Sequence, residues 1–460
     1  MLKKYIGDRE FYRKLFAVMV PVLIQNVITN FVSLLDNIMV GRVGTEPMSG
    51  VAIVNQILFI YNLCIFGSLA GAGIYTAQYY GKGDQQGVKN SMRFKFWVVL
   101  GVLAVALCLL CTYGEELISL FIHEGEDNLD LTATLHFARQ YMNVMLLQMP
   151  LFALLNVYSS TLRETGETKI PMRAGILAVF VNLFFNYMLI FGKLGAPKLG
   201  VVGAAVATVL ARVVECAIII IYTHTHTAKH PFAKGLYRSM KVPAGLAGQV
   251  SKTGMPLLIN ELLWSGGMTT LNQIMSRRGL EVVSAENIAA TASNLFFCAF
   301  FAMGTAISII VGQLLGAGKL EQAVDEDRKL IAFSVTLSAV VGVMMALLSP
   351  YVPRIYNTTE IVRHLATGML IINAVMMPAN AFTNSCFFTL RSGGKAFLTF
   401  LYDSVYIWVL SIPLTLFLVK GTALPIIPIY AMCYGVDIIK CVIGYVLVKK
   451  RIWVNNLVAD

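Results

Sequence analysis

The chain has 460 residues, of which 57% are hydrophobic and only 13% are charged, and its mean hydropathy is +0.70. A soluble protein of this length could not keep so much apolar surface away from water, so the composition excludes the soluble classes. The net charge of +11 is spread over many short loops rather than gathered in one basic patch, which excludes a nucleic-acid-binding role.

Apolar stretches follow one another along the chain, each of about twenty residues, which is long enough to cross a hydrocarbon core roughly 30 Å thick as a helix. They are too continuous for barrel strands, in which apolar and polar residues alternate. The amino-terminal segment lacks the cleavage site of a signal peptide, so the first span is expected to be retained. We therefore predict an all-α integral membrane protein with twelve transmembrane helices at residues 15–38, 50–77, 95–114, 135–160, 170–192, 200–223, 255–275, 286–314, 330–350, 366–390, 396–419 and 425–448.

The second half of the chain repeats the first. Pro21 of VMVPVLIQN corresponds to Pro256 of TGMPLLINE at a spacing of 235 residues, and further on a spacing of 228 residues relates Pro150 to Pro378. Duplicated hydrophobic halves with helices interrupted in corresponding places are typical of transporters. We predict helix bends at these four prolines. The predicted domains are an amino-terminal six-helix lobe at residues 1–222, a cytoplasmic linker at 223–252 and a carboxy-terminal six-helix lobe at 253–460.

The positions of Lys and Arg indicate how the spans are oriented, because these residues are enriched in cytoplasmic loops. If the amino terminus is cytoplasmic, most of the 36 Lys and Arg residues fall on that side of the membrane. The loop at residues 114–130 would then be external, and it carries six carboxylates but no Lys or Arg. We therefore predict that both termini are cytoplasmic and that basic stretches such as 234–241 lie on anionic membrane lipid.

The linker at residues 223–252 holds three His residues but no Cys or carboxylate. A metal site built from His224, His226 and His230 would need a further protein ligand. A solvated connection is therefore the favoured interpretation, and we predict neither a metal site there nor a cofactor elsewhere.

Charged and amide residues inside the predicted spans are candidates for function, because the membrane makes each of them costly. Asp36 lies near the outer end of the first span. Asn182 and Asn186 are one helical turn apart on the fifth span and so share a face. Glu261 follows Pro256 on the seventh span with no cation within one turn, so it must face a cavity or carry a proton.

Other intramembrane charges have a structural explanation. Arg212 and Glu215 share a helix face, and so do Asp437 and Lys440, so each pair is interpreted as mutual neutralisation, with a functional role for Asp437 left open. Asp403 lies a few residues beyond a cytoplasmic turn, where an exposed carboxylate costs little, or it faces a cavity. The residues that we select for a substrate cavity are Gln25, Asn26, Trp264, Asn380 and Asp403.

Segments in both halves resemble motifs of the multidrug and toxic compound extrusion (MATE) family of secondary transporters. The segment SLLDNIMVGRVG, with Pro21 before it, resembles the first-helix pattern of the family. LRETGETKIPM and LRSGGKA resemble its turn motif, and VNLFFNYMLIFGKLGAPKLGVVGAAVAT resembles its fifth-to-sixth segment. The resemblance covers essentially the whole chain. It implies two six-helix lobes that form a V around a central cavity.

The resemblance also implies a function, which is the export of organic, often cationic, compounds in exchange for inward Na⁺ or H⁺. By position, Glu261 matches a carboxylate on the seventh helix of NorM-like bacterial members, whereas Asn380 stands where that branch carries an Asp. The expected location is a bacterial cytoplasmic membrane, and the expected state is a monomer. The residues that match the ion-coupling cluster of the amino-terminal lobe are Asp36, Asn182, Asn186 and Thr208.

Physical chemistry allows two coupling ions at this cluster. Asp36 in a cavity of low dielectric can be neutral with a proton, or charged and holding Na⁺ together with the amide and hydroxyl oxygens. An enzyme is not indicated, because the chain has no metal-ligand pair on a span, no nucleophile elbow and no phosphate-binding loop. A flippase for lipid-linked saccharides or another lipid, with the same two-lobe fold, is the alternative. Such a flippase would be expected to line its cavity with several Arg or Lys.

Overall fold

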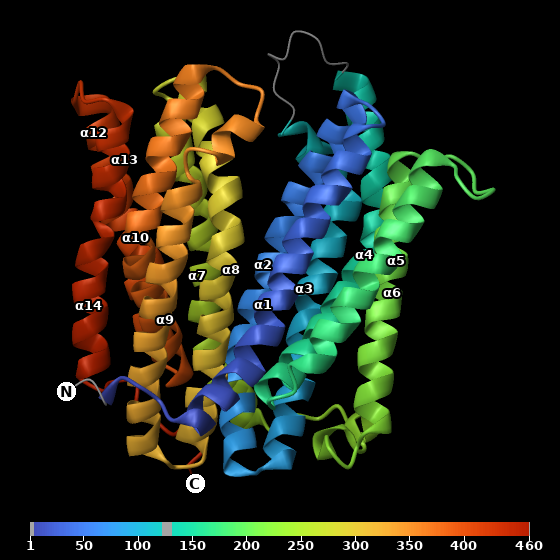
Figure 1. Ribbon diagram of the computed structural model, residues 1–460. Helices are drawn as coiled ribbons and strands as arrows, with labels where there is room; N and C mark the ends of the chain where they lie inside the picture. Colours follow the sequence, from blue (N-terminus) through green and yellow to red (C-terminus); the bar gives the residue numbers. More distant parts are fainter. Residues whose placement is uncertain (1–3, 122–130, 460) are drawn as a thin grey trace. The chain divides into compact units, whose positions relative to one another are not determined.

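The computed structural model describes residues 4–121 and 131–459, and every regular element in these two ranges is helical (Figure 1). The predicted all-α fold class is therefore confirmed. The first half contains α1 (Arg9–Gly41), α2 (Thr45–Lys82), α3 (Gln85–Ser119), α4 (Leu131–Glu164), α5 (Lys169–Phe191) and α6 (Val201–Thr225). The second half contains α7 (Ala244–Ser276), α8 (Leu280–Gly316), α9 (Leu320–Leu348), α10 (Glu360–Ser392), α11 (Ala396–Phe400), α12 (Ile412–Gly421), α13 (Ile426–Gly435) and α14 (Asp437–Lys449).

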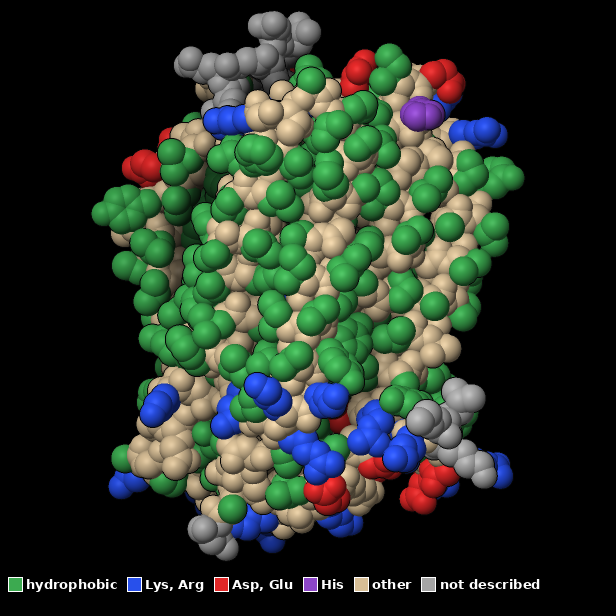
Figure 2. Space-filling model, turned by 90° about the vertical axis from the view of Figure 1, so that its left-hand side faces the viewer, with side chains coloured by type: hydrophobic (Ala, Val, Ile, Leu, Met, Phe, Trp, Pro, Cys, Tyr) green, Lys and Arg blue, Asp and Glu red, His purple; other side chains and the backbone are tan. Residues whose placement is uncertain are grey.

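Eleven helical segments of the described chain are long and apolar enough to cross a membrane. They match eleven of the predicted spans, and α7 lies where the seventh span was predicted, although polar residues such as Asn260 and Glu261 lower its hydropathy. The face in Figure 2 is a broad apolar band between two charged rims, with most of its Lys and Arg at one rim. Of the predicted external loop, residues 122–130 lie outside the described residues.

The last two predicted spans are each built from more than one helical segment. Two π-helical turns, Leu401–Val405 and Ile407–Ser411, join α11 to α12, and the last span consists of α13 and α14. Each of the four prolines predicted as a helix bend lies inside a helix and removes one backbone hydrogen bond from it. The bends themselves stay a prediction.

The described chain forms two compact units. The first-half unit comprises Ile24–Thr76 and Gln85–Val250. The second-half unit comprises Ser251–Asp460 together with Met1–Leu23 and Ala77–Asp84. The amino-terminal part of α1 and the carboxy-terminal end of α2 therefore belong to the second-half unit. The division predicted from the sequence, at the linker, assigned both of these segments to the amino-terminal lobe.

Two glycines that correspond in the internal repeat allow a close helix contact within the second-half unit. A Cβ atom added to Gly81 of α2 would lie 1.9 Å from the carbonyl oxygen of Gln313, and one added to Gly316 of α8 would lie 1.9 Å from that of Gln78. Only a residue without a side chain fits at such a distance. The repeated glycines therefore have a packing function.

Gln78 also holds the carboxy-terminal segment in place. Its side-chain nitrogen donates to the carbonyl oxygens of Ser392 and Asn455, at 3.0 and 3.3 Å, and its side-chain oxygen accepts from the amide of Leu457 at 2.8 Å. Trp453 of the same segment is 1% exposed. The residues after α14 are thus packed against the helices.

The linker is only in part the solvated connection that its composition predicts. Phe232, Leu236 and His230 are buried, and burial lowers the pKa of His230. Arg93 of α3 donates to the carbonyl oxygens of Leu236 and Gly235, at 3.1 and 3.3 Å. The prediction holds for the basic side chains Lys234 and Arg238, which are exposed, but it was wrong for the apolar side chains beside them, which pack within the first-half unit.

Candidate functional site

Four polar residues of the first-half unit form a hydrogen-bonded chain across three helices. The side-chain nitrogen of Asn186 donates to the Asp36 carboxylate at 2.6 Å and to the amide oxygen of Asn182 at 3.0 Å. Asn182 donates in turn to the hydroxyl of Thr208 at 3.4 Å. The structure therefore brings together the four residues that the sequence selects as the ion-coupling cluster.

Local sequence explains why these residues meet. Asn182 and Asn186 are four residues apart on α5, so their side chains lie on one face. Thr208 lies on α6, where Gly203 permits a close approach, because a Cβ atom at Gly203 would lie 2.7 Å from the carbonyl oxygen of Leu189 on α5. Asn182 and Asn186 are 5% and 1% exposed, so their polar atoms need partners.

Asp36 forms no ion pair within the described residues. The positive charge of Arg212 attracts the Asp36 carboxylate. The Arg212 guanidinium, however, forms an ion pair with Glu215 at 2.5 Å, which compensates most of that charge. The predicted neutralisation of Arg212 by Glu215 is therefore confirmed. A carboxylate in this setting has to be stabilised by a hydrogen-bond donor, a proton or another cation.

One oxygen of this cluster lacks a partner. The Oδ1 atom of Asn186 is buried and accepts no hydrogen bond from any residue that the structure describes. Hard cations prefer oxygen ligands, and the cluster offers carboxylate, amide and hydroxyl oxygens. The donor set therefore fits a Na⁺ ion, and it equally fits a proton on Asp36. No group of three or more His, Cys, Asp or Glu suited to another metal occurs in the described part of the chain.

Tyr141, which lies within reach of the charge of Asp36, and its partner Asn55 were not selected from the sequence. The hydroxyl of Tyr141 on α4 donates to Asn55 on α2 at 3.3 Å, and the charge of Asp36 acts on Tyr141. Asn55 has the same signal as the selected amides, which is a polar side chain inside an apolar span. Tyr141 carries no such signal, because Tyr is common in membrane helices.

The second-half unit contains a different polar group. The Asp403 carboxylate, on the first π-helical turn, accepts from Lys440 Nζ at 2.7 Å and from the amide of Asn260 at 3.2 Å. The sequence predicted that Lys440 would neutralise Asp437 on its own helix. That prediction was wrong, because the turn carrying Asp403 brings a better-placed carboxylate to the ammonium group.

Glu261 lies on α7, next to Asn260, and forms no hydrogen bond or ion pair within the described residues. The charges of Arg391 and Asp403 act on it with opposite signs. Its role in ion coupling stays a prediction.

The residues selected for a substrate cavity are divided between the two units. Gln25 and Asn26 belong to the first-half unit, whereas Trp264, Asn380 and Asp403 belong to the second-half unit. The first four side chains are half-buried. Their role therefore also stays a prediction.

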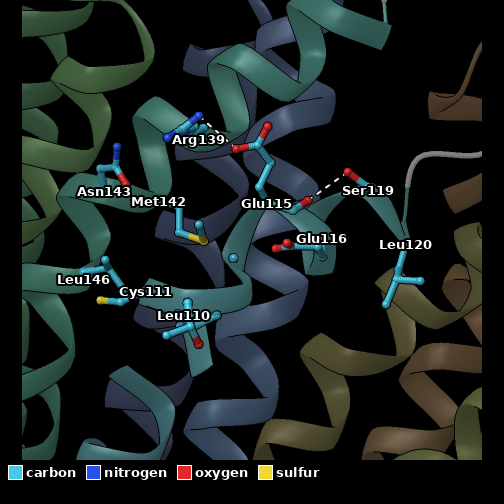
Figure 3. A pocket seen from close by; sticks show the side chains of 12 residues that line it. Leu110, Cys111, Glu115, Glu116, Ser119, Leu120, Arg139, Met142, Asn143 and Leu146 are labelled. Carbon is cyan, nitrogen blue, oxygen red and sulfur yellow. Dashed lines mark hydrogen bonds and ion pairs between the residues drawn. The ribbon is translucent and has the colours of Figure 1, made fainter. Parts of the chain in front are cut away.

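A hollow of about 720 Å³ opens between the ends of α3 and α4 (Figure 3). Glu115 and Arg139 turn toward each other in it and form an exposed ion pair at 2.9 Å. None of the residues selected from the sequence lines this hollow. Its charged pair is exposed to solvent and contributes little to stability.

Comparison with known proteins decides the family. The profile of the MatE family matches residues 21–188 and 256–417, one segment in each half and together more than half of the chain. The chain belongs to the MatE family. The resemblance found in the sequence motifs is thereby confirmed, and the protein is a multi-pass membrane transporter rather than an enzyme.

The relatives agree over nearly the full length. The chain is 26% identical over 428 residues to a probable multidrug resistance protein, NorM, of Thermotoga maritima, covering 91% of this chain and 89% of that protein. It is 23% identical to a probable multidrug resistance protein, YoeA, of Bacillus subtilis, covering 97% and 96%. A solved multidrug resistance MATE family transporter superposes with a TM-score of 0.86 and 18% identity over 98% of this chain and 97% of that chain, which shows the shared fold.

Proposed function

We propose that this MATE transporter exports organic cations and neutral amphipathic compounds in exchange for Na⁺ or H⁺ that moves inward. The observation that carries the proposal is the cluster around Asp36. Among the described residues, its carboxylate has no ion pair and the Oδ1 atom of its neighbour Asn186 has no hydrogen-bond partner. The multidrug resistance names of the relatives support the class of cargo.

The exchange follows from the two states of Asp36. With a bound ion or proton, the carboxylate is satisfied by that cation; without it, the carboxylate depends on the Asn186 amide at 2.6 Å. Asp36 lies fifteen residues after Pro21 on α1, so its occupancy can bias the conformation of a helix weakened by proline. If the cation and the cargo favour different conformations, each binding event drives release of the other.

The charges inside the spans favour neutral or cationic cargo. Arg212 is paired with Glu215 and Lys440 with Asp403, so neither is available to a polyanionic lipid without losing its partner. Glu261, in contrast, is a carboxylate without an ion pair in the described residues. This arrangement, with the names of the relatives, makes a lipid-linked saccharide flippase the less supported alternative.

We further propose a bacterial inner-membrane protein that acts as a monomer, with both termini in the cytoplasm. The support is the rim of Lys and Arg in Figure 2 and the excess of these residues in alternate loops. Reporter fusions at either terminus and in the 223–252 linker are expected to report a cytoplasmic location. An external linker would contradict this orientation.

Transport into everted membrane vesicles tests the proposed function. The cargo is the fluorescent cation 4-(4-dimethylaminostyryl)-N-methylpyridinium, and the lumen is loaded first with Na⁺ and then with acid. One of the two gradients is expected to drive dye uptake, and its collapse is expected to stop it. Dye uptake that ignores both gradients, or no uptake at all, would contradict the proposal.

A further inference from the structure

Lys440 lies where a bound cation would be expected. Its Nζ atom is 2.7 Å from the Asp403 carboxylate, 5.3 Å from the centre of the Tyr402 ring and 5.6 Å from that of Tyr406. A carboxylate flanked by two aromatic faces is the chemistry that binds organic nitrogen cations. The ammonium group of Lys440 thus occupies the position of such a ligand.

Residues other than Lys440 hold the Asp403 carboxylate and the Tyr406 ring in place. Asn260 and Ser404 are 1% and 0% exposed, and the Ser404 hydroxyl donates to the amide oxygen of Asn260 at 2.7 Å while Asn260 donates to Asp403. The hydroxyl of Tyr406 donates to the carbonyl oxygen of Val436 at 2.6 Å. The ammonium group of Lys440, in contrast, lies at the end of a flexible side chain of four carbons. The carboxylate and rings would therefore keep their places if the lysine moved.

The ion pair is partly exposed, and Lys440 has a second carboxylate nearby. The side chains of Lys440 and Asp403 are 12% and 15% exposed, so the ion pair is not sealed inside the protein. Asp437 stands one helical turn before Lys440 on α14, and the two charges already attract each other. A displaced ammonium group would keep a carboxylate neighbour.

The backbone at Asp403 is unusual. Two successive π-helical turns occur here, Leu401–Val405 and Ile407–Ser411. Tyr402 and Asp403 lie in the first turn, and Tyr406 lies between the two. π-helical turns inside α-helices are rare and occur frequently at functional sites. They provide a second, independent indication that this group serves more than packing.

We propose that Asp403, Tyr402 and Tyr406 form a binding site for the charged nitrogen of an organic cation, and that Lys440 fills this site as a tethered competitor until the cation displaces it. The inference rests on the proposed export of organic cations and adds the subsite that selects their charge. Because one cation replaces another, the net charge of the site stays constant during binding. Neutral cargo gains nothing from this exchange.

Binding to the purified full-length protein tests the inference with two dyes that differ by one charge. The cation is 4-(4-dimethylaminostyryl)-N-methylpyridinium, and its neutral counterpart is 4-(4-dimethylaminostyryl)pyridine at a pH where the pyridine is unprotonated. Lys440→Gln is expected to bind the cation at least about tenfold more tightly, because a competitor at roughly millimolar effective concentration is gone. Affinity for the neutral dye is expected to be unchanged.

Two further variants serve as controls. Lys440→Arg keeps a competitor that pairs more strongly with a carboxylate, so cation affinity is expected to stay at or below the wild-type value. The double variant Asp403→Asn with Lys440→Gln removes both charges of the ion pair, and it is expected to lose the preference for the cationic dye. This variant decides the matter if Lys440→Gln does not yield folded protein.

The outcomes separate the inference from the proposed function. If wild-type protein exports the cationic dye but Lys440→Gln leaves its affinity unchanged or lower, or shifts both dyes equally, the inference is wrong and the proposed function stands. Retained wild-type cation preference in the double variant also overturns it. If the wild type neither binds nor exports the cationic dye, both fail.

Discussion

The last span of each half of the chain carries a positive charge, and the two halves pair it differently. Arg212 lies on α6 and Lys440 on α14, and at the repeat spacing of 228 residues Gly175 corresponds to Asp403. In the second half Lys440 pairs with Asp403, whereas in the first half Arg212 pairs with Glu215 on its own helix. A Cβ atom on Gly175 would lie 3.4 Å from the Glu215 carboxylate, so a carboxylate fills this region in both halves but comes from a different helix.

The two ion pairs differ in a way that separates a structural role from a role in transport. The Arg212 pair joins residues three apart on one helix and holds its shape locally. The Lys440 pair joins two distant segments and can open. Asp36 has no charged counterpart, because Leu271 stands at its repeat position. We therefore expect shared positions to control stability and unshared ones to control transport.

The repeated glycines should show the largest effect if the comparison holds. Gly81→Ala and Gly316→Ala each place a Cβ atom 1.9 Å from a backbone oxygen. The cost should exceed the roughly 1–3 kcal/mol of an overpacked core, and both variants should lose folded protein in size-exclusion chromatography. Gly101→Ala is the matched control. A Cβ atom added to Gly101 of α3 would meet no described atom within 4 Å, so this variant should fold normally. A folded, active Gly81→Ala protein would show that the contact is not needed.

Removal of the Glu215 carboxylate tests whether the first-half pair is structural. Breaking a buried pair costs about 3–5 kcal/mol, and we expect about 2 kcal/mol for Glu215→Gln because Arg212 is 28% exposed and partly screened. The melting temperature in detergent should fall accordingly. Glu115→Gln breaks the exposed pair with Arg139 and should leave the melting temperature unchanged. Equal melting temperatures for Glu215→Gln and Glu115→Gln would contradict a structural role of Glu215.

Asn186→Ala probes the ion-coupling cluster without touching a charge. The variant loses the amide that donates to Asp36 and the unsatisfied Oδ1 atom. We expect the ion concentration for half-maximal transport to rise about tenfold, which corresponds to about 1.4 kcal/mol. Asn143→Ala, at the exposed hollow of Figure 3, is the control and should not change it. An unchanged ion dependence in Asn186→Ala would exclude Asn186 as a ligand.

Glu261→Gln should have the smallest effect of the four. Glu261 has no hydrogen-bond or ion-pair partner among the described residues, so its charge is available to cargo or a coupling ion. Efflux should fall severalfold, with expression near normal. The exposed Glu321, whose side chain is 82% accessible, provides the control variant Glu321→Gln. Wild-type efflux in Glu261→Gln would show that this carboxylate is only tolerated.

Sequence periodicity and spacing predicted the spans and the shared face of Asn182 and Asn186, whereas the family resemblance was needed to place Asp36 and Thr208 with them. Apolar runs gave the spans because the membrane imposes their length. Asn182 and Asn186 could be placed together because four residues make one helical turn. Arg212 and Glu215 could be paired by the same rule, and the structure confirms it.

The same local rule failed for Lys440, because its partner is 37 residues away in sequence. The π-helical turns that present Asp403 have no signature in the apolar segment that contains them. The burial of the linker and the docking of the carboxy-terminal segment by Gln78 also depend on tertiary contacts. Contacts of this kind follow from packing of the whole unit, which spacing within one helix does not encode.

Simultaneous measurement of dye and ion movement in Asp36→Asn tests the central claim most directly. Wild-type and variant proteins are reconstituted into liposomes, and efflux of the styrylpyridinium cation is recorded together with radioactive Na⁺ uptake and luminal pH. Asn keeps the size of Asp36 and removes only its charge. We predict that the wild type exchanges dye for one of the two ions, and that the variant binds dye in detergent with normal affinity but moves neither dye nor ion. Coupled exchange at the wild-type rate in Asp36→Asn would contradict the account.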